Sequence, residues 1–525
     1  MGAWQDTAGG LRFQSGKSAR TGAGWRAPLR APASVCCRDT RVNHFVPSTT
    51  PAEGLGVLLL FRLIDQATPD FFDPARPIQV TRAPGRLDVM GGFADYSGSL
   101  VLQLPTAEAA CAAIQARSDD QLRLWSPCRD GSRTQRLSTR LADLGLPDQP
   151  IDYQEAHAFL CGDPRDRWAG YLLGCLLVLA RERGLRPTQG FDLLVHSDVP
   201  EGKGVASSAA VAVAAMRALG ARYGLDLPDR ELALLCQRVE NAIVGAPCGV
   251  MDPMVAAAGQ ADQLLALRCQ PCEVEGSLPV PTELEFVGLD SGVRHAITGS
   301  DYGSVRVGAF LGQRLLAALR GLPVRQHEGR HHADDPVWRG YLANCPIAEF
   351  DREFAARLPV TMRGQEFLQQ FGGHADPHTR IEPEREYPVR APTRHPMAEN
   401  QRVERFRALL QTEPTESVRQ ELGALMYEAH AGYSACGLGH EVTDFLVEQA
   451  KLRAAAGAPL YGAKVTGGGS GGTVVLFGAR GKVWYEALRL KKALQQHTGH
   501  SGHVFRWSSP GAFAFGHVEL RPAHG

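Results

Sequence analysis

Residues 200–210 form a glycine-containing turn with the composition of a phosphate-binding loop. The segment reads Pro-Glu-Gly-Lys-Gly-Val-Ala-Ser-Ser-Ala-Ala and lies between a predicted strand and a predicted helix. Glycines let backbone N–H groups come close to a phosphate, the helix N-terminus adds the positive end of its dipole, and Ser207 or Ser208 can offer a hydroxyl to phosphate or Mg²⁺. The segment lacks the Gly-Lys-Ser/Thr ending of a Walker loop. Taken alone, it predicts either a phosphate cradle or an ordinary helix N-cap.

A second glycine cluster, residues 464–473, reads Lys-Val-Thr-Gly-Gly-Gly-Ser-Gly-Gly-Thr and holds five glycines in six positions. Glycine loses more conformational freedom on folding than any other residue, so such a run is costly unless the backbone turns sharply or lies against another surface. A flexible loop is the alternative. A predicted strand follows directly, and this argues against a mere linker.

Two further segments carry charged residues that could take part in chemistry. Glu240 precedes a glycine-containing turn that ends at Asp252, where a carboxylate could meet a substrate hydroxyl while Glu240 could reach a metal ion. Residues 82–96 read Arg-Ala-Pro-Gly-Arg-Leu-Asp-Val-Met-Gly-Gly-Phe-Ala-Asp-Tyr. An arginine near an aspartate there could form a structural ion pair or neutralise a transferring phosphoryl group. Lone carboxylates are usually solvated, so each segment carries weight only together with the others.

The elements that must position these segments follow from hydrophobic periodicity and from Gly and Pro punctuation. The sequence predicts strands at residues 78–80, 100–104, 191–195 and 474–477, with a turn at 82–86. It predicts helices at residues 168–183, 209–222, 229–244, 403–411, 415–431 and 441–455. Residues 320–400 are rich in Pro, His, Asp and Arg, which indicates loops or an insertion.

The composition is that of a globular protein without a polybasic surface. At about 150 residues per domain, the 525 residues suggest roughly two to four domains. Lys plus Arg and Asp plus Glu both total 56, so no global basic field exists to hold a nucleic acid or an anionic membrane. No apolar run reaches the length of about 18 residues that a membrane span needs. The 12 scattered cysteines indicate reduced thiols and a cytoplasmic location.

Residues 1–55 lack the regular pattern of the rest of the chain. The first 45 carry seven Lys or Arg against two acids, without an apolar period. This predicts a disordered tail, with an organellar transit segment as the alternative.

In this order and spacing, the four segments resemble the signature motifs and the catalytic turn of the GHMP sugar kinases, the family named for galactokinase, homoserine kinase, mevalonate kinase and phosphomevalonate kinase. The resemblance covers roughly residues 76–518. It implies an α+β fold of two lobes. The N-terminal α/β lobe, residues 76–285, would hold the phosphate loop, and the C-terminal lobe, residues 286–520, would have a ferredoxin-like core with an irregular insertion at about 320–400.

The resemblance also implies roles for individual residues. Asp252 matches the catalytic aspartate, and Arg86 matches the arginine that lies against it and against the transferred phosphate. Positions that contact the sugar are matched by Asp95, Gly249 and Tyr302. The nucleotide phosphates would be bound by Gly202, Lys203, Gly204, Val205, Ala206, Ser207, Ser208 and Ala209, with Ser208 and Glu240 as Mg²⁺ partners. Gly467, Gly468 and Gly469 match the third motif, which supports the phosphate loop.

One departure from the galactokinase pattern bears on the sugar. Galactokinases have Gly-Glu-His-Thr-Asp-Tyr where this chain has a Gly92-Phe93 pair in place of Glu-His. L-arabinose has the ring configuration of galactose but lacks the C6 hydroxymethyl group. A site for it therefore needs no hydrogen-bond partner there, and Phe93 could fill part of the vacated volume. Both Gly92 and Phe93 are thus expected at the sugar. Residues 244–310 and 461–473 also resemble the arabinose-phosphorylating members of the family.

The function implied is phosphorylation of the anomeric hydroxyl of L-arabinose to β-L-arabinose 1-phosphate with ATP and Mg²⁺. Alternatives are a galactokinase or another anomeric sugar kinase and, less favoured, a sensor that binds sugar and ATP without turnover. The expected partners are the sugar and ATP, with no nucleic acid and no membrane. The oligomeric state is left open between a monomer and a weak dimer. Trp125, Trp168 and Trp338 could stack on adenine, although packing within the fold is the favoured role.

Overall fold

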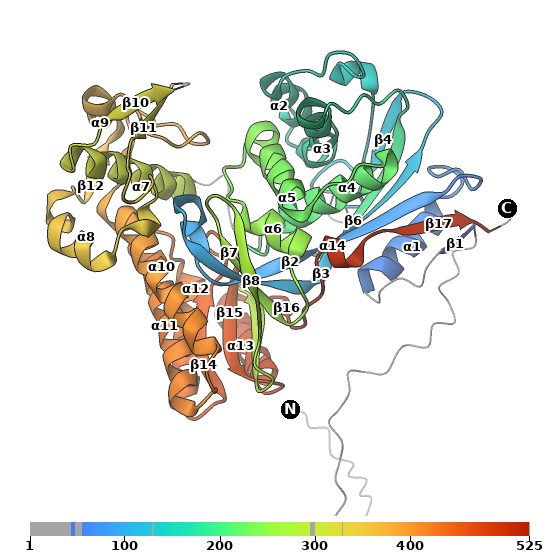
Figure 1. The fold of residues 1–525 in the computed structure, drawn as a ribbon. Helices are drawn as coiled ribbons and strands as arrows, with labels where there is room; N and C mark the ends of the chain where they lie inside the picture. The colour runs from blue at the N-terminus through green and yellow to red at the C-terminus, as the bar shows by residue number, and fades with distance from the viewer. Residues whose placement is uncertain (1–43, 48–54, 129–130, 295–299, 328, 524–525) are drawn as a thin grey trace, which may run out of the picture. The chain divides into compact units, whose positions relative to one another are not determined.

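The computed structural model describes residues 44–47, 55–128, 131–294, 300–327 and 329–523 (Figure 1). All of these residues belong to one compact unit, Val42–Gly525. Among the described residues, no helix combines the length and the apolar character needed to cross a membrane.

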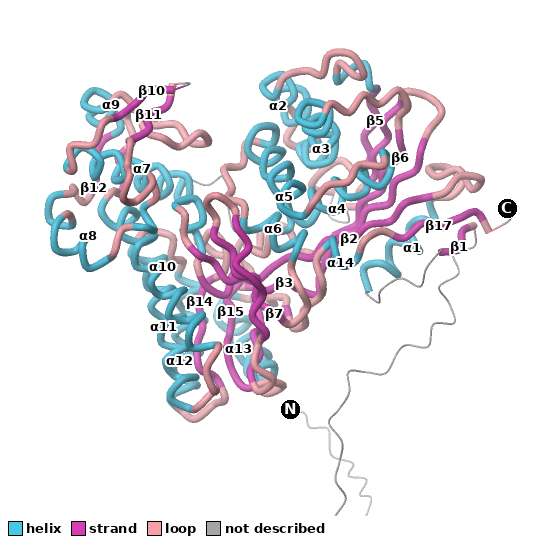
Figure 2. The backbone as a smooth tube through the Cα atoms, viewed as in Figure 1, coloured by secondary structure: helices cyan, strands magenta, loops and turns pink. Residues whose placement is uncertain are grey.

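Among the described residues, the main sheet has nine strands, and one of its two long central strands carries the start of the charged segment at residues 82–96. β2 (Ile78–Met90) pairs antiparallel with β3 (Leu100–Ala116) along most of its length. Through its second half β3 also pairs with β6 (Phe191–Ser197), and through its first half with β7 (Gln263–Arg268). Figure 2 shows β2 and β3 as long magenta bands. The remaining members are β1 (Phe45–Pro47), β4 (Gln121–Trp125), β5 (Arg136–Arg140), β8 (Glu273–Pro279) and β17 (Val518–Pro522).

Helices cover both faces of this sheet because successive side chains of a strand point to opposite sides. Ala110 and Ala112 of β3 join the core of α3 (Arg167–Arg183) and α4 (Ser207–Tyr223), whereas Cys111 and Ala113 pack with α1 (Leu55–Ala67). The alanine-rich α4 lies so close to β2 that the Thr81 hydroxyl donates to the Ala214 carbonyl at 2.7 Å. Neighbouring helices are α2 (Tyr153–Cys161), α5 (Asp229–Arg238), a π-helical turn (Val239–Val244), α6 (Met251–Ala258) and α14 (Ala512–Phe515).

A second sheet has four strands in the order β14-β15-β9-β16, formed by β14 (Leu460–Val465), β15 (Thr473–Ala479), β9 (Leu284–Asp290) and β16 (Val504–Phe505). In chain order these strands alternate with helices as β-α-β-β-α-β, which confirms the predicted ferredoxin-like core. One face packs on α12 (Glu441–Ala455) and α13 (Val483–Thr498). The other face joins the main core, together with α10 (Arg390–Leu410) and α11 (Glu416–Ala435).

Between β9 and β14 of the second sheet, the chain passes through α7 (Ser300–Leu319) into residues 320–389, which we call the insertion segment. This segment contains short elements rather than loops alone: β10 (Val324–His327), β11 (Arg330–Ala333), α8 (Ile347–Glu353), β12 (Thr361–Arg363), α9 (Gly364–Phe371), β13 (Glu386–Pro388) and two 3-10 turns at Leu342–Asn344 and Ala355–Arg357. It has a hydrophobic core of its own, and Phe93, Tyr96 and Tyr302 belong to that core. The region predicted as irregular therefore ends early, because α10 begins at Arg390.

The predicted turn at residues 82–86 is wrong. β2 runs through these residues, with an irregularity in its pairing to β3 between Pro84 and Arg86. A bulge tolerates a proline, which cannot donate to the ladder. Gly85 is required there by a close approach, since a Cβ on it would lie 2.7 Å from the Val205 carbonyl oxygen.

Two expected boundaries are also wrong. β17 lies at the end of the predicted C-terminal lobe, yet it pairs with β2 in the main sheet, so the chain returns to the first lobe before it ends. Phe45–Pro47, inside the predicted tail 1–55, forms β1 and pairs with β17. Residues 1–43 and 48–54 lie outside the described residues.

The helices predicted at 168–183 and 209–222 and the strand predicted at 191–195 are confirmed within a few residues. The helix predicted at 229–244 consists of α5 and the π-helical turn.

Candidate active site

A cavity of about 590 Å³ gathers most of the residues that the sequence singles out. Its walls come from β2, α3, the turn before α4, the π-helical turn, the start of α6, α7 and the second glycine cluster. The predicted residues that line it are Arg86, Phe93, Asp95, Gly202, Gly204, Ala206, Ser207, Ser208, Glu240, Gly249, Asp252, Tyr302, Gly467 and Gly468. Gly92, Lys203, Val205, Ala209 and Gly469 are not among the lining residues.

Arg86 and Asp252 form a bidentate ion pair in the wall of the cavity. Nε and Nη2 of Arg86 donate to Oδ1 and Oδ2 of Asp252 at 2.9 and 3.0 Å. Nη1 of Arg86 donates to the Gly204 carbonyl at 2.5 Å. The Arg86 side chain is 3% exposed, against 21% for Asp252. Asp252 stands in the first turn of α6, where the helix dipole favours a negative charge. The pair therefore fixes a carboxylate at the cavity surface beside the glycine turn.

The turn at residues 202–206 is held in an unusual backbone conformation. Gly202, Gly204 and Ala206 have φ values of 70°, 67° and 61°, and α4 begins immediately afterwards at Ser207. In the left-handed region of φ and ψ, the Cβ atom of a residue comes too close to the carbonyl oxygen that follows it. Glycine has no Cβ and adopts this conformation without strain. Ala206, Ser207 and Ser208 line the cavity, so the N-terminus of α4 lies at the cavity wall, where its N–H groups and helix dipole would stabilise an anion.

The second glycine cluster packs against this turn and keeps it in place. The Thr473 hydroxyl donates to the Lys203 carbonyl at 2.9 Å, and a Cβ on Gly467 would lie 2.7 Å from the Gly204 carbonyl oxygen. The Lys203 ammonium forms an ion pair with Asp290 at 3.2 Å. Lys203 thus serves here to tie the turn to β9, and the glycine cluster is a packed support rather than a flexible loop.

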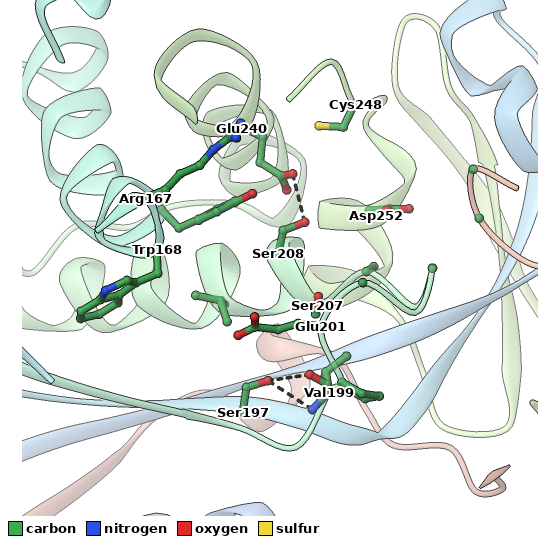
Figure 3. A pocket seen from close by; sticks show the side chains of 18 of the residues that line it. Arg167, Trp168, Ser197, Val199, Glu201, Ser207, Ser208, Glu240, Cys248 and Asp252 are labelled. Carbon is green, nitrogen blue, oxygen red and sulfur yellow. Dashed lines mark hydrogen bonds between the residues drawn. The ribbon is translucent and has the colours of Figure 1, made fainter. Parts of the chain in front are cut away.

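Ser208 and Glu240 lie side by side in the cavity wall, next to the glycine turn that precedes α4. The Ser208 hydroxyl donates to Glu240 Oε2 at 3.1 Å, as the dashed line in Figure 3 shows. Burial raises the pKa of Glu240 to about 8, and the neighbouring Asp252 carboxylate adds to the rise. Serine hydroxyl and carboxylate oxygens are the ligands that Mg²⁺ prefers. Ser208 and Glu240 therefore form a donor pair that fits a Mg²⁺ ion, whose charge would also favour the ionised Glu240 carboxylate.

Asp95 presents to the cavity a buried carboxylate with one oxygen that has no hydrogen-bond partner among the described residues. The residue is 2% exposed, and its Oδ1 accepts no hydrogen bond from a described residue. Burial raises the pKa of Asp95 to about 7, with the Asp252 carboxylate contributing. Gly249 packs directly against this carboxylate, since a Cβ on it would lie 1.5 Å from Asp95 Oδ2. A ligand hydroxyl would satisfy such an acceptor.

An aromatic group forms the wall beside Asp95. The Phe93 ring stacks on His395, with centroids 4.0 Å apart and planes 9° apart, and meets Tyr433 edge-on at 4.8 Å. Burial lowers the pKa of His395 to about 4, so the imidazole packs as a neutral ring. Phe93 thus lies in the cavity wall as predicted, on a support that the sequence did not reveal.

Gly92 does not lie at the cavity surface. Its φ is +44°, and a Cβ on it would lie 1.9 Å from the Tyr433 hydroxyl, which donates to the Gly467 carbonyl at 2.7 Å. A glutamate at this position, as galactokinases have, would therefore require Tyr433 to move. The absent Glu side chain is explained by a tyrosine that occupies its space.

Sequence reasoning missed Tyr171 and Leu172 of α3 as cavity residues, and for Trp168 it favoured packing within the fold over a place at the cavity. Trp168, Tyr171 and Leu172 line the cavity, and the Arg133 guanidinium lies 5.0 Å from the Trp168 ring centre. In Figure 3, Ser208 stands between Trp168 and Asp252. The i, i+3, i+4 spacing of these three side chains was visible in the sequence and predicted one helix face, but that pattern does not separate a core face from a ligand face. The expected packing role of Trp125 agrees with its edge-on contact with Phe71 at 5.8 Å. The Trp338 ring is buried.

Comparison with known proteins adds three findings. The family model "GHMP kinases N terminal domain" matches residues 170–260. The chain is 42% identical to an L-arabinokinase of Arabidopsis thaliana over 87% of its own length, and it spans 48%, about half, of that protein. It is 31% identical to a galactokinase of Streptomyces coelicolor, with 77% of this chain and 85% of the relative covered. A crystal structure of Lactococcus lactis galactokinase with galactose shares the fold, with a TM-score of 0.65, 18% identity and coverage of 87% of this chain and 98% of the other.

Proposed function

Since the chain belongs to the GHMP kinase family, we propose that it is an ATP-dependent sugar-1-kinase whose substrate is L-arabinose and whose products are β-L-arabinose 1-phosphate and ADP. The observation that carries the proposal is the position of the Arg86–Asp252 pair. It lies in one cavity with both the glycine turn before α4 and Asp95, whose buried Oδ1 has no hydrogen-bond partner among the described residues. A phosphate-binding end and a hydroxyl-binding end thus meet at a fixed carboxylate.

The reaction transfers the γ-phosphoryl group to the C1 oxygen of the sugar. The C1 oxygen forms a bond to the γ-phosphorus, the bond from this phosphorus to the β,γ-bridging oxygen breaks, and the hydroxyl proton is lost. Asp252 would orient or deprotonate the C1 hydroxyl. Because both of its oxygens accept hydrogen bonds from Arg86, the carboxylate has a fixed direction, and this supports an orienting role. Arg86 would offset negative charge that spreads over the transferring group.

The remaining residues bind and align the two substrates. The N–H groups at the start of α4 would hold the phosphates of ATP, and Trp168 offers a ring for the adenine. Ser208 and Glu240, with Asp252 beside them, would hold Mg²⁺, which supplies positive charge at the phosphates when bound. Asp95 would accept a sugar hydroxyl. Such alignment contributes a large share of the rate in phosphoryl transfer, since the protein does little covalent chemistry.

Two observations favour L-arabinose over galactose. Tyr433 fills the space of a side chain at position 92, and Phe93 makes the neighbouring wall aromatic. A hydroxymethyl group at this wall would lose its hydrogen bonds to water without replacement. The identity of 42% to an L-arabinokinase points the same way.

The test is a coupled ADP-release assay with Mg-ATP and, in separate reactions, L-arabinose, D-galactose, D-glucuronate, D-xylose or no sugar. We expect the highest kcat/KM with L-arabinose and no sugar-dependent turnover in Asp252→Ala. A preference for galactose would contradict the assigned substrate but keep the reaction. ATP binding without turnover of any sugar would contradict the kinase and favour a sensor.

A further inference from the structure

Two arginine–aspartate pairs lie beside α7, one near the start of the helix and one just past its end. Near the start of α7, Nε and Nη2 of Arg306 donate to Oδ2 and Oδ1 of Asp376, both at 2.8 Å. Just past the end of α7, Nη1 of Arg320 donates to Oδ2 of Asp335 at 2.9 Å. The first pair is 4% and 0% exposed and the second 16% and 6%. Arg306–Asp376 therefore ties the insertion segment to α7, whereas Arg320–Asp335 is an ion pair within the segment itself.

Only the first of these pairs reaches the sugar end of the cavity. Nη1 of Arg306 donates to the Pro247 carbonyl at 3.3 Å, and the guanidinium lies 5.1 Å from the centre of the Tyr96 ring. Pro247 and Tyr302 line the cavity, whereas Arg306 and Asp376 do not. Tyr302 stands one helical turn before Arg306 on α7. Arg306 thus lies directly behind the wall that holds Asp95.

Arg306 touches two chain segments, one at Tyr96 and one at Pro247. These two segments pack tightly against each other beside Arg306. Tyr96 follows Asp95 in the chain, and Pro247 comes two residues before Gly249. Asp95 and Gly249 are packed so closely that a Cβ on Gly249 would overlap the Asp95 carboxylate, at 1.5 Å from Oδ2. By holding Tyr96 and the Pro247 carbonyl, Arg306 fixes both sides of this contact and hence the position of the Asp95 carboxylate.

Asp376 in turn is built to hold Arg306. The Thr379 hydroxyl donates to Asp376 Oδ2 at 2.6 Å, and the His378 N–H donates to Oδ1 at 3.3 Å. Burial opposes ionisation of this carboxyl, but the charge and hydrogen bonds of Arg306 hold the pKa of Asp376 at about 2. A buried pair with all strong partners satisfied keeps one geometry.

We propose that Asp376 and Arg306 are positioning residues through which the insertion segment sets the sugar end of the cavity, so that this segment takes part in sugar recognition. The inference rests on the proposed sugar kinase activity. Neither residue touches the sugar. Asp376 holds the guanidinium, and the guanidinium holds Tyr96 and Pro247 around Asp95. The shared hydrophobic core of the insertion segment, Phe93, Tyr96 and Tyr302 supplies the apolar part of the same support.

The test compares Asp376→Asn with the matched control Asp335→Asn, which removes the Arg320–Asp335 ion pair within the same segment. In Asp376→Asn we expect KM for the sugar, and Kd from calorimetric titration with sugar alone, to rise by about 10-fold or more. KM for ATP should stay within about 2-fold. In Asp335→Asn, all three values should stay near those of the wild type. Equal changes in the two variants, or parallel changes in the KM values for sugar and ATP, would show a merely structural tether and overturn the proposal.

A second variant keeps the test decisive if Asp376→Asn does not fold. Arg306→Gln with Asp376→Asn removes both charges but retains hydrogen-bonding groups, so no lone charge is buried. We expect near wild-type melting with sugar KM still raised, because the bridge to Tyr96 and Pro247 is lost. Wild-type sugar KM in this folded double variant would overturn the proposal. A wild type that turns over no sugar would instead refute the kinase proposal, and the inference would fall with it.

Discussion

At the proposed phosphate end of the cavity, the turn before α4 is shaped by its backbone, whereas the proposed sugar end consists of buried side chains. The turn at residues 202–206 is shaped by positive φ angles and by backbone contacts with the second glycine cluster. Asp95, Phe93 and Tyr302 form the sugar end, and they come from segments some 200 residues apart in the chain. A backbone site can be encoded by one short run, but a side-chain site depends on contacts that only the assembled fold supplies.

The carboxylates that line the cavity also differ from the ion pair behind its wall in how their charges are balanced. Arg306 and Asp376 neutralise each other, and the pKa of Asp376 is held at about 2. Asp95 and Glu240 are buried with little compensation, and their pKa values are raised to about 7 and about 8. Groups left in this condition at a cavity wall are those that bound substrates and metal would stabilise.

The largest expected effect lies at Asp252, where the two ends meet. Asp252→Asn should lower kcat by a factor on the order of 10³, because the C1 hydroxyl would lose its fixed acceptor while both substrates still bind. Steady-state ADP release measures kcat, and KM for sugar and ATP should change only a few-fold. The exposed Asp226→Asn is the control. A fall of less than 10-fold would mean that the carboxylate contributes little to the reaction.

A glycine-to-alanine substitution at each end of the cavity should raise KM for one substrate and leave KM for the other nearly unchanged. In Gly249→Ala the new methyl group meets the Asp95 carboxylate, so KM for the sugar should rise on the order of 100-fold with KM for ATP nearly unchanged. Gly204 has φ +67°, and a Cβ there would lie 3.1 Å from the Thr466 carbonyl oxygen. Gly204→Ala should therefore raise KM for ATP instead. The same substrate affected in both variants would contradict the division of the cavity.

A smaller effect is expected on the α3 wall. Trp168→Ala should raise KM for ATP by about 10-fold, since stacking of a base on an aromatic ring is worth about 1–3 kcal/mol. KM for the sugar should remain as in the wild type. Trp507, which is 67% exposed and does not line the cavity, provides the matched control as Trp507→Ala. Equal KM values for ATP in the wild type and Trp168→Ala would place the adenine elsewhere.

The smallest effect concerns stability of the protein without substrates. Between pH 3.8 and about 7 the folded protein retains the Asp95 proton that the unfolded chain has lost. The folded state then binds more protons, so this residue lowers stability as pH rises through that window. Asp95→Asn should therefore raise Tm by a few degrees at pH 8 and by less at pH 5, as measured by calorimetry.

Asp119 provides the opposite case. The hydrogen bond from Arg117 lowers the pKa of Asp119 to about 2, so its stabilising contribution is present above the unfolded pKa and lost as pH falls toward 2. Asp119→Asn should give no gain in Tm at pH 8. A gain in both variants at pH 8 would show that the effect of Asp95→Asn is not specific to its raised pKa.

Elements with a strong local pattern were predictable. α3, α4 and β6 match their predicted ranges within a few residues, because apolar periodicity and alanine content act within the segment itself. The strand through residues 82–86 was missed, because Pro84-Gly85 is a turn signal locally, while pairing with β3 around a bulge decides the structure. The insertion segment was called irregular, because its elements are too short to show a period.

For the site, the sequence by itself determined the phosphate end: two glycine-rich runs, Ser208, and the charged residues Arg86 and Asp252 could be identified from their types and order. Only the tertiary structure decided that Tyr433 excludes a side chain at position 92, and that Asp376 holds Arg306 behind Asp95. The physical reason is that a glycine run records a backbone requirement where it occurs. A buried ion pair or a packed ring, by contrast, consists of single residues 70 to 345 positions apart in the chain, as in Arg306–Asp376 and Tyr433–Asp88, and such residues carry no local pattern.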